Sequence, residues 1–133
     1  MFRWALAMSV VGALSAFAAT PVPVILDTDI GDDIDDTWAL AMLLGSPEID
    51  LKLIVTASDD TESKTRLVAK MLERMGRTDI PLATGVKNSS RELHQAEWTG
   101  DYALADYQGT IIEDGVGALV QAINAAPAPV TLC

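Results

Sequence analysis

The stretch that decides the fold runs from residue 24 to residue 40 and contains Val24-Ile25-Leu26-Asp27-Thr28-Asp29-Ile30-Gly31-Asp32-Asp33-Ile34-Asp35-Asp36-Thr37-Trp38-Ala39-Leu40. Residues 23–27 form a short apolar run rich in β-branched side chains, bounded by prolines and by an acidic loop, which predicts a buried strand. Residues 38–44 are apolar and helix-forming, with acidic residues before them and Gly45 after them, which predicts a helix. An acidic loop joins the strand to the helix.

The same alternation continues along the rest of the chain. Residues 51–57, 80–86 and 130–132 have the pattern of further strands, and residues 61–75 and 113–126 that of further helices. The polar segment 87–110 shows no sustained period, which predicts one long loop. This order predicts an α/β fold in which helices flank a parallel sheet. We expect the sheet to be truncated after about the fourth strand, because Cys133 is the last residue.

Composition excludes several classes of protein. The 133 residues are 50% hydrophobic and carry 9 Lys+Arg against 19 Asp+Glu, a formal net charge of -10. This acidity argues against binding to nucleic acid or to an anionic membrane surface, since both are held by clustered cations. The apolar content excludes an intrinsically disordered chain, and the single cysteine excludes an internal disulfide.

Residues 1–18 have the parts of a secretory signal peptide. Arg3 precedes an uncharged apolar run over residues 5–14, and the segment ends in small residues at Ala16 and Ala18. The run is shorter than the roughly 20 residues that span a bilayer, which argues against a retained anchor. The sequence therefore predicts an exported protein, periplasmic or secreted, in which residues 19–133 form the domain and keep no membrane segment after cleavage.

Six aspartates lie between residues 27 and 36, where the first predicted strand meets the first predicted helix. In doubly wound sheets this carboxyl edge is where ligands bind. Carboxylates so close together repel one another, and a hard cation such as Ca²⁺, which takes six to eight oxygen ligands, would relieve that repulsion. The alternative is a solvated helix cap, which explains Asp35 and Asp36 but not Asp27 and Asp29 at the strand end.

Two known acidic motifs place aspartates at a spacing similar to that of this loop. An EF-hand counted from Asp27 would need aspartate at its fifth position and glycine at its sixth, where the chain has Gly31 and Asp32. A phosphatase of the haloacid-dehalogenase type also begins with Asp-x-Asp after a strand. It expects Thr or Val where Gly31 stands, so it remains only an alternative.

Residues 24–31 and 35–40 resemble the N-terminal fingerprint of the inosine/uridine-preferring nucleoside hydrolases, Asp-x-Asp-Pro-Gly-x-Asp-Asp-Ala. The chain departs from this fingerprint at Ile30, at Thr37 and by two extra residues after Gly31. The similarity continues through residues 54–64, where Ser58-Asp59 replaces the family's Gly-Asn, and through residues 80–85 and 113–132. It thus covers nearly all of residues 19–133.

This resemblance implies cleavage of the N-glycosidic bond of ribonucleosides by a calcium-activated water. Asp29 would be both calcium ligand and general base, and Asp36 the second calcium carboxylate. Carboxylates suit this chemistry, because the bond breaks through a positively charged, oxocarbenium-like state. The two extra residues leave a second register open, with Asp32 and Asp33 as the paired aspartates. We prefer the Asp35-Asp36 register, because the residues that follow it continue the family's helix.

Other site residues also follow from the resemblance. Asp35 would hold a ribose hydroxyl, and Asp59 takes the place of a ribose-contacting Asn. Asp27 would brace the site, and Asp33 would support it. The implied partner is a ribonucleoside substrate, and the full-length family allows a homo-oligomer.

The family's domain is about twice as long as this chain, and its remaining site residues have no counterpart here. We therefore expect the N-terminal portion of such a domain, with an incomplete site and poor activity, since ligand number and a closed cavity both matter. A non-catalytic acidic module that binds Ca²⁺ or a partner through residues 27–36 is the alternative from another class.

Overall fold

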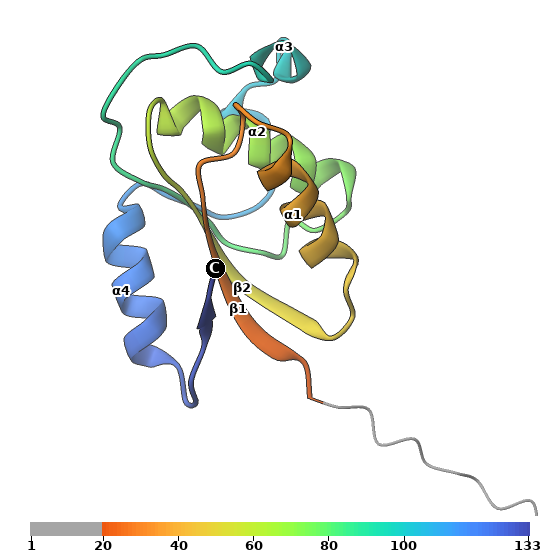
Figure 1. Ribbon diagram of the computed structural model, residues 1–133, viewed down its shortest axis with the longest axis vertical. Helices are drawn as coiled ribbons and strands as arrows, with labels where there is room; N and C mark the ends of the chain where they lie inside the picture. The colour runs from red at the N-terminus through yellow and green to blue at the C-terminus, as the bar shows by residue number, and fades with distance from the viewer. Residues whose placement is uncertain (1–19) are drawn as a thin grey trace, which may run out of the picture.

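A computed structural model describes residues 20–133, and the predicted signal peptide at residues 1–18 lies outside this part of the chain. The elements follow one another as β1 (Val22–Thr28), α1 (Asp35–Gly45), β2 (Ile49–Thr56), α2 (Thr61–Arg74), β3 (Leu82–Thr84), α3 (Ala96–Thr99), the 3-10 turn η1 (Leu104–Asp106), β4 (Ile111–Ile112), α4 (Gly115–Ala125) and β5 (Thr131–Leu132) (Figure 1). The predicted α/β fold is confirmed.

The strands form one sheet in the order β4-β3-β2-β1-β5, and every neighbouring pair is parallel. Helices α1 and α2 lie on one side of the sheet and α4 on the other (Figure 1). The strand alternation produces these two layers: Val24 and Leu26 of β1 face the α1 and α2 side, whereas Ile25 faces α4. Each face therefore has its own apolar core.

The larger core lies between the sheet and the helices α1 and α2. On α2 the buried residues recur at helical spacing, which is why this segment forms a well-packed helix: Thr61, Lys64, Thr65, Leu67, Val68, Ala69 and Leu72. The α4 side is thinner. Only Ala118 of α4 joins its buried cluster, while Val116, Val120 and Ile123 are 52%, 52% and 43% exposed.

Two boundaries differ from the sequence prediction. The segment 87–110 contains the short turns α3 and η1, and directly after it Ile111 and Ile112 form a strand that the alternation did not reveal. A strand of two residues is too short to show a period, and it exists because Ile111 and Ile112 pair with Leu82 and Ala83 of β3. The strand at 130–132 is therefore β5, the fifth along the chain. Among residues 20–133 no helix combines the length and the apolar character needed to cross a membrane.

Candidate active site

Three threonines mark the carboxyl edge of the sheet. Thr28, Thr56 and Thr84 end β1, β2 and β3 and are paired in register across the sheet. The Thr28 hydroxyl accepts a hydrogen bond from the Ile30 amide at 3.2 Å, and the Thr56 hydroxyl lies 2.9 Å from that of Thr65 in α2. The strand ends are thus tied to the loops that follow them. These loops carry the acidic residues.

The loop between β1 and α1 turns at Gly31 and is anchored by Ile30, which is completely buried. Gly31 has φ = +116°, and a Cβ there would lie 2.9 Å from Cδ1 of Leu93. The backbone conformation is one that favours glycine, and the flexible end of the Leu93 side chain would have to shift to admit a Cβ. The Gly31 carbonyl also accepts a hydrogen bond from the Gln95 amide at 2.9 Å, so the segment after β3 packs directly on this loop.

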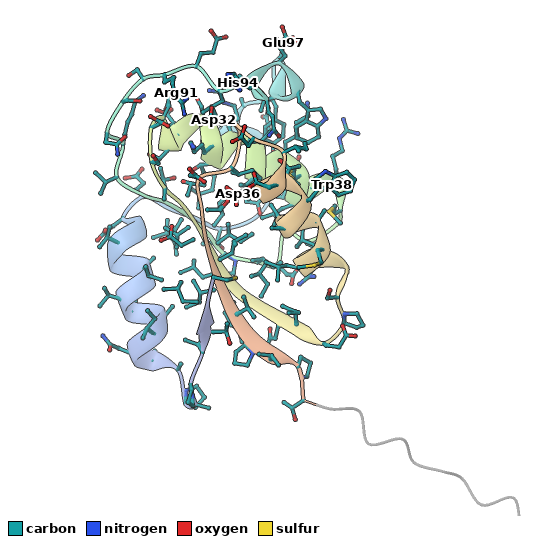
Figure 2. All side chains as sticks on the ribbon, viewed as in Figure 1. Asp32, Asp36, Trp38, Arg91, His94 and Glu97 are labelled. Atoms are coloured by element: carbon teal, nitrogen blue, oxygen red, sulfur yellow. The ribbon has the colours of Figure 1, made fainter. Side chains whose placement is uncertain are left out.

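Asp29 and Asp36 are brought face to face. Asp29 follows β1, and the half-buried Asp36 lies in the first turn of α1. Figure 2 labels Asp36 at that position. Burial, followed by the contact with the Asp29 carboxylate and the charge of Asp35, raises the pKa of Asp36 to about 6, and a contact with Thr28 opposes the rise. The two carboxylates therefore repel each other in the absence of a cation.

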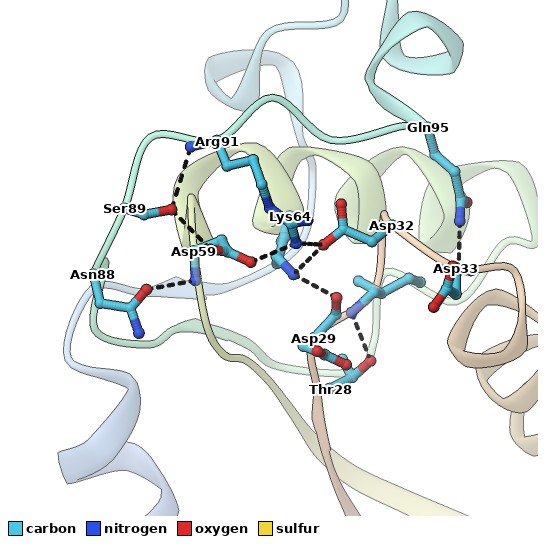
Figure 3. A network of polar contacts seen from close by, with 11 residues as sticks. Thr28, Asp29, Asp32, Asp33, Asp59, Lys64, Asn88, Ser89, Arg91 and Gln95 are labelled. Carbon is cyan, nitrogen blue, oxygen red and sulfur yellow. Dashed lines mark hydrogen bonds and ion pairs between the residues drawn. The ribbon is translucent and has the colours of Figure 1, made fainter.

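Asp32 lies instead between two basic side chains (Figure 3). Its Oδ2 is 2.5 Å from Nη2 of Arg91 and 3.7 Å from Nζ of Lys64, whose side chain is completely buried. Lys64 also donates a hydrogen bond to the main-chain carbonyl of Asp29. The other oxygen of Asp32, Oδ1, is buried and has no hydrogen-bond partner within residues 20–133. Asp32 thus belongs to an ion-pair network, separate from the Asp29–Asp36 contact.

Asp59 lies in the loop between β2 and α2, in a backbone that non-glycine residues rarely adopt. Ser58 and Asp59 have φ = +63° and +48°. The Asn88 side chain stabilises this turn by accepting a hydrogen bond from the Asp59 amide at 2.8 Å. Ser89 Oγ and Arg91 Nη2 donate to the Asp59 carboxylate at 2.7 and 2.8 Å, and these contacts hold its pKa below the usual range. Both of its oxygens are therefore engaged.

The remaining predicted residues are exposed. Asp35 lies in the first turn of α1. The main-chain carbonyl of Asp33 accepts a hydrogen bond from Gln95 Nε2 at 2.7 Å. Asp27 is on β1 beside β5, and its amide donates to the Cys133 carbonyl at 2.8 Å. The structure therefore joins Asp29 to Asp36, and Asp32 to Asp59 through Arg91. Asp27, Asp33 and Asp35 take part in neither of these two contacts and are exposed.

Sequence reasoning missed Lys64 and Arg91. Lys64 had a usable signal, because it precedes Leu67, Val68 and Leu72 at helical spacing and so belongs to the buried face of α2. A lysine on that face needs an internal partner. Arg91 gave no signal, since it lies in a polar segment without periodicity.

The fit of a metal ion rests on the Asp29–Asp36 contact. Two facing carboxylates are suitable hard-oxygen ligands, and a cation would remove their mutual repulsion, which together with burial, the largest cause, raises the pKa of Asp36. In the part of the chain that the structure describes, however, no three or more His, Cys, Asp or Glu residues gather as a metal-binding group. Residues 20–133 thus fit part of a hard-cation site, well short of the six to eight oxygens that Ca²⁺ takes.

Known proteins similar to this chain share both sequence and fold with it. The pyrimidine-specific ribonucleoside hydrolases RihA of Escherichia coli O139:H28 (strain E24377A / ETEC) and O9:H4 (strain HS) are each 47% identical over 75 residues, 54% of this chain and 24% of theirs. The chain therefore matches about a quarter of the length of these relatives. The type III effector XopQ, solved in complex with adenosine diphosphate ribose, matches 86% of this chain and 36% of its own with a TM-score of 0.64 and 21% identity, a likeness of fold.

The family comparison extends over almost the whole described region. The model of the inosine-uridine preferring nucleoside hydrolases matches residues 24–133, from the first buried residue of β1 to the end of the chain. The match includes the acidic loop, the strained turn at Asp59 and the row of threonines. This chain belongs to the inosine-uridine preferring nucleoside hydrolase family.

Proposed function

We propose that this chain carries the cation-binding part of a ribonucleoside hydrolase site, in which Asp29 and Asp36 hold Ca²⁺. The observation that carries the proposal is the contact of these two carboxylates at the carboxyl edge of the sheet. The ion-pair network leaves them available, because Asp32 is held by Lys64 and Arg91 instead. Family membership supports the hydrolase over a phosphatase of the haloacid-dehalogenase type.

Asp29 and Asp36 have different roles in the proposed hydrolysis. Asp29 is exposed and takes the proton of the attacking water as general base. Asp36, half-buried and near Asp29, keeps a negative charge close to the anomeric carbon, where positive charge develops as the glycosidic bond breaks. When bound, Ca²⁺ supplies the positive charge that acidifies the water and removes the repulsion between Asp29 and Asp36.

At the ribose end, we assign the hydroxyl contact to Asp35. Its side chain is exposed in the first turn of α1, next to Asp36. The Asp59 carboxylate is occupied by Ser89 and Arg91, so a direct ribose contact would have to displace one of them. Asp59 therefore acts on the site by fixing Arg91, whose other contact is Asp32.

The second candidate is a module that binds Ca²⁺ without turnover. The observation that favours it is the small ligand set, since two carboxylates supply few of the oxygens that calcium takes. For the same reason we expect slow hydrolysis from this chain. The predicted leader supports a site of action outside the cytoplasm for either candidate.

The test is hydrolysis of inosine and uridine by the purified chain, measured as released base with 5 mM Ca²⁺ or with EDTA. The proposal predicts slow, calcium-dependent release that Asp29→Asn abolishes and that Asp101→Asn, an exposed aspartate of the long loop, leaves unchanged. Calcium binding without any release would favour the module. Release that persists in EDTA or in Asp29→Asn would contradict the assigned roles.

A further inference from the structure

Lys64 is an ammonium group inside the protein, at the base of the acidic loop. Its side chain is completely buried on α2, among the apolar residues Leu67 and Val68. An ammonium in such surroundings is costly unless it is paired and hydrogen-bonded. The resemblance to nucleoside hydrolases gave this lysine no role, so its burial needs an explanation of its own.

The partners of Lys64 all belong to the loops at the carboxyl edge. Nζ donates to the main-chain carbonyl of Asp29 and lies 3.7 Å from Oδ2 of Asp32 (Figure 3). Its charge also contributes, after Ser89 and Arg91, to the low pKa of Asp59. Lys64 thus holds Asp29 by its backbone and leaves the Asp29 carboxylate to face Asp36.

We propose that Lys64 is a positioning residue, an internal cation that fixes the β1–α1 loop so that Asp29 and Asp36 present their carboxylates to one bound cation. This inference rests on the proposed function, because it assumes that the two carboxylates are ligands. Arg91 assists from the outside, since it binds the same oxygen of Asp32 from the segment after β3. A loop held in this way keeps its shape before a cation arrives, which is the role of outer-shell groups at metal sites.

The alternative role for Lys64 predicts an effect of opposite sign. If Lys64 were only a positive charge near the aspartates, it would repel an incoming cation, and its removal would tighten binding. If Lys64 positions the loop, its removal frees the Asp29 backbone and weakens binding. Outer-shell groups of this kind change metal affinity by about 10- to 100-fold when they are removed.

The experiment compares Lys64→Met with Lys70→Met. Methionine keeps the apolar stem of lysine and removes the charge. Lys70 is a matched control, because it lies on the same helix and also donates to main-chain carbonyls, those of Trp98 and Thr99, away from the acidic loop. The cation probe is Tb³⁺, a luminescent substitute for Ca²⁺, excited through Trp38 two residues after Asp36. Amide hydrogen exchange of residues 29–34 without any cation is the second readout.

We expect Lys64→Met to weaken Tb³⁺ binding by about tenfold or more and to accelerate exchange in residues 29–34 by about tenfold, a measure of local opening. Lys70→Met should leave both within about twofold of the unsubstituted chain. Tighter or unchanged Tb³⁺ binding in Lys64→Met would overturn the proposal, and so would unchanged exchange. If the unsubstituted chain does not bind Tb³⁺, the proposed cation site is wrong, and the exchange data still decide whether Lys64 holds the loop.

A second pair of variants covers the case in which Lys64→Met does not fold because Asp32 loses its buried partner and keeps only the exposed Arg91. Asp32→Asn is compared with Asp32→Asn/Lys64→Met, so that the two proteins differ only at residue 64. The positioning role predicts weaker Tb³⁺ binding and faster loop exchange in the double variant. Equal or tighter binding in the double variant would contradict it.

Discussion

Replacing Asp36 by asparagine should stabilise the cation-free protein while removing a cation ligand. Asp36 is half-buried and faces Asp29, and its pKa is raised to about 6 from 3.8. The folded state therefore prefers the protonated carboxyl, and the ionised form that exists at pH 7.5 costs stability. Asparagine carries no charge at any pH, so Asp36→Asn removes this cost.

The magnitude follows from the shift in pKa. At about 1.36 kcal/mol per unit, a rise from 3.8 to about 6 corresponds to about 3 kcal/mol as an upper limit. Solvent screening of a half-buried side chain reduces this to about 1.5 kcal/mol. Loss of the favourable interaction with the N-terminus of α1 subtracts about 0.5 kcal/mol. We expect Asp36→Asn to raise the free energy of unfolding by about 1 kcal/mol at pH 7.5.

Urea denaturation in EDTA at pH 7.5 and pH 4 measures this difference, with Asp35→Asn as control. Between pH 3.8 and 6 the folded state binds more protons at Asp36 than the unfolded state does, so its contribution to stability falls as pH rises. The advantage of Asp36→Asn should thus be largest at pH 7.5 and nearly absent at pH 4. The exposed Asp35→Asn should change stability by less than about 0.5 kcal/mol at either pH. An Asp36→Asn protein that is less stable at pH 7.5, or whose difference does not depend on pH, would refute the reasoning.

Three further substitutions test the packing around the site. Gly31→Ala should cost about 2 kcal/mol in urea denaturation, because φ = +116° strains the backbone of a residue that has a Cβ. A loss below about 0.5 kcal/mol would mean that the loop can turn differently. Leu72→Ala, at a completely buried position of α2, should cost 2–5 kcal/mol by the same assay, whereas the 65%-exposed Met42→Ala should cost less than about 0.5. Arg91→Met should accelerate amide exchange in residues 87–95, because two ion pairs hold this segment to the acidic loops; unchanged exchange would show that the ion pairs do not order it.

The strand–loop–helix segment at residues 24–40 could be predicted because three local signals agree there. The apolar run, the aspartates and Gly31 each indicate a structure within a few residues, and Gly31 has φ = +116°, a backbone conformation that favours glycine. In a parallel sheet the carboxyl ends of neighbouring strands lie at one edge. The proximity of the two acidic loops that follow β1 and β2 could therefore also be predicted.

The electrostatic pairing could not be predicted in the same way. Six aspartates in ten residues give no indication of which of them share a cation and which form ion pairs. The answer depends on Lys64 and Arg91, 32 and 59 residues after Asp32 in the sequence, and their contacts exist only in the folded chain. Strand β4 was missed for a similar reason, because its two residues form a strand only by pairing with β3.

The exposed side of α4 shows that helical periodicity can predict a helix without predicting which of its faces is buried. Val116, Val120 and Ile123 recur at helical spacing, yet in residues 20–133 they face outward, while Ala118 packs on the sheet. The close approach of α4 to the sheet selects small residues. A Cβ on Gly115 would lie 2.6 Å from the Thr84 carbonyl oxygen. A hydrophobic stripe therefore identified the helix correctly without identifying its buried face.

The central claim is that Asp29 and Asp36 together hold one cation, and a calcium titration of thermal stability tests it most directly. Binding to the folded state at 100 times Kd stabilises a protein by about 2.7 kcal/mol. We predict that Ca²⁺ raises the unfolding midpoint of the unsubstituted chain and leaves that of Asp36→Asn unchanged. An unsubstituted chain that Ca²⁺ does not stabilise, or an equal rise in both proteins, would contradict the account.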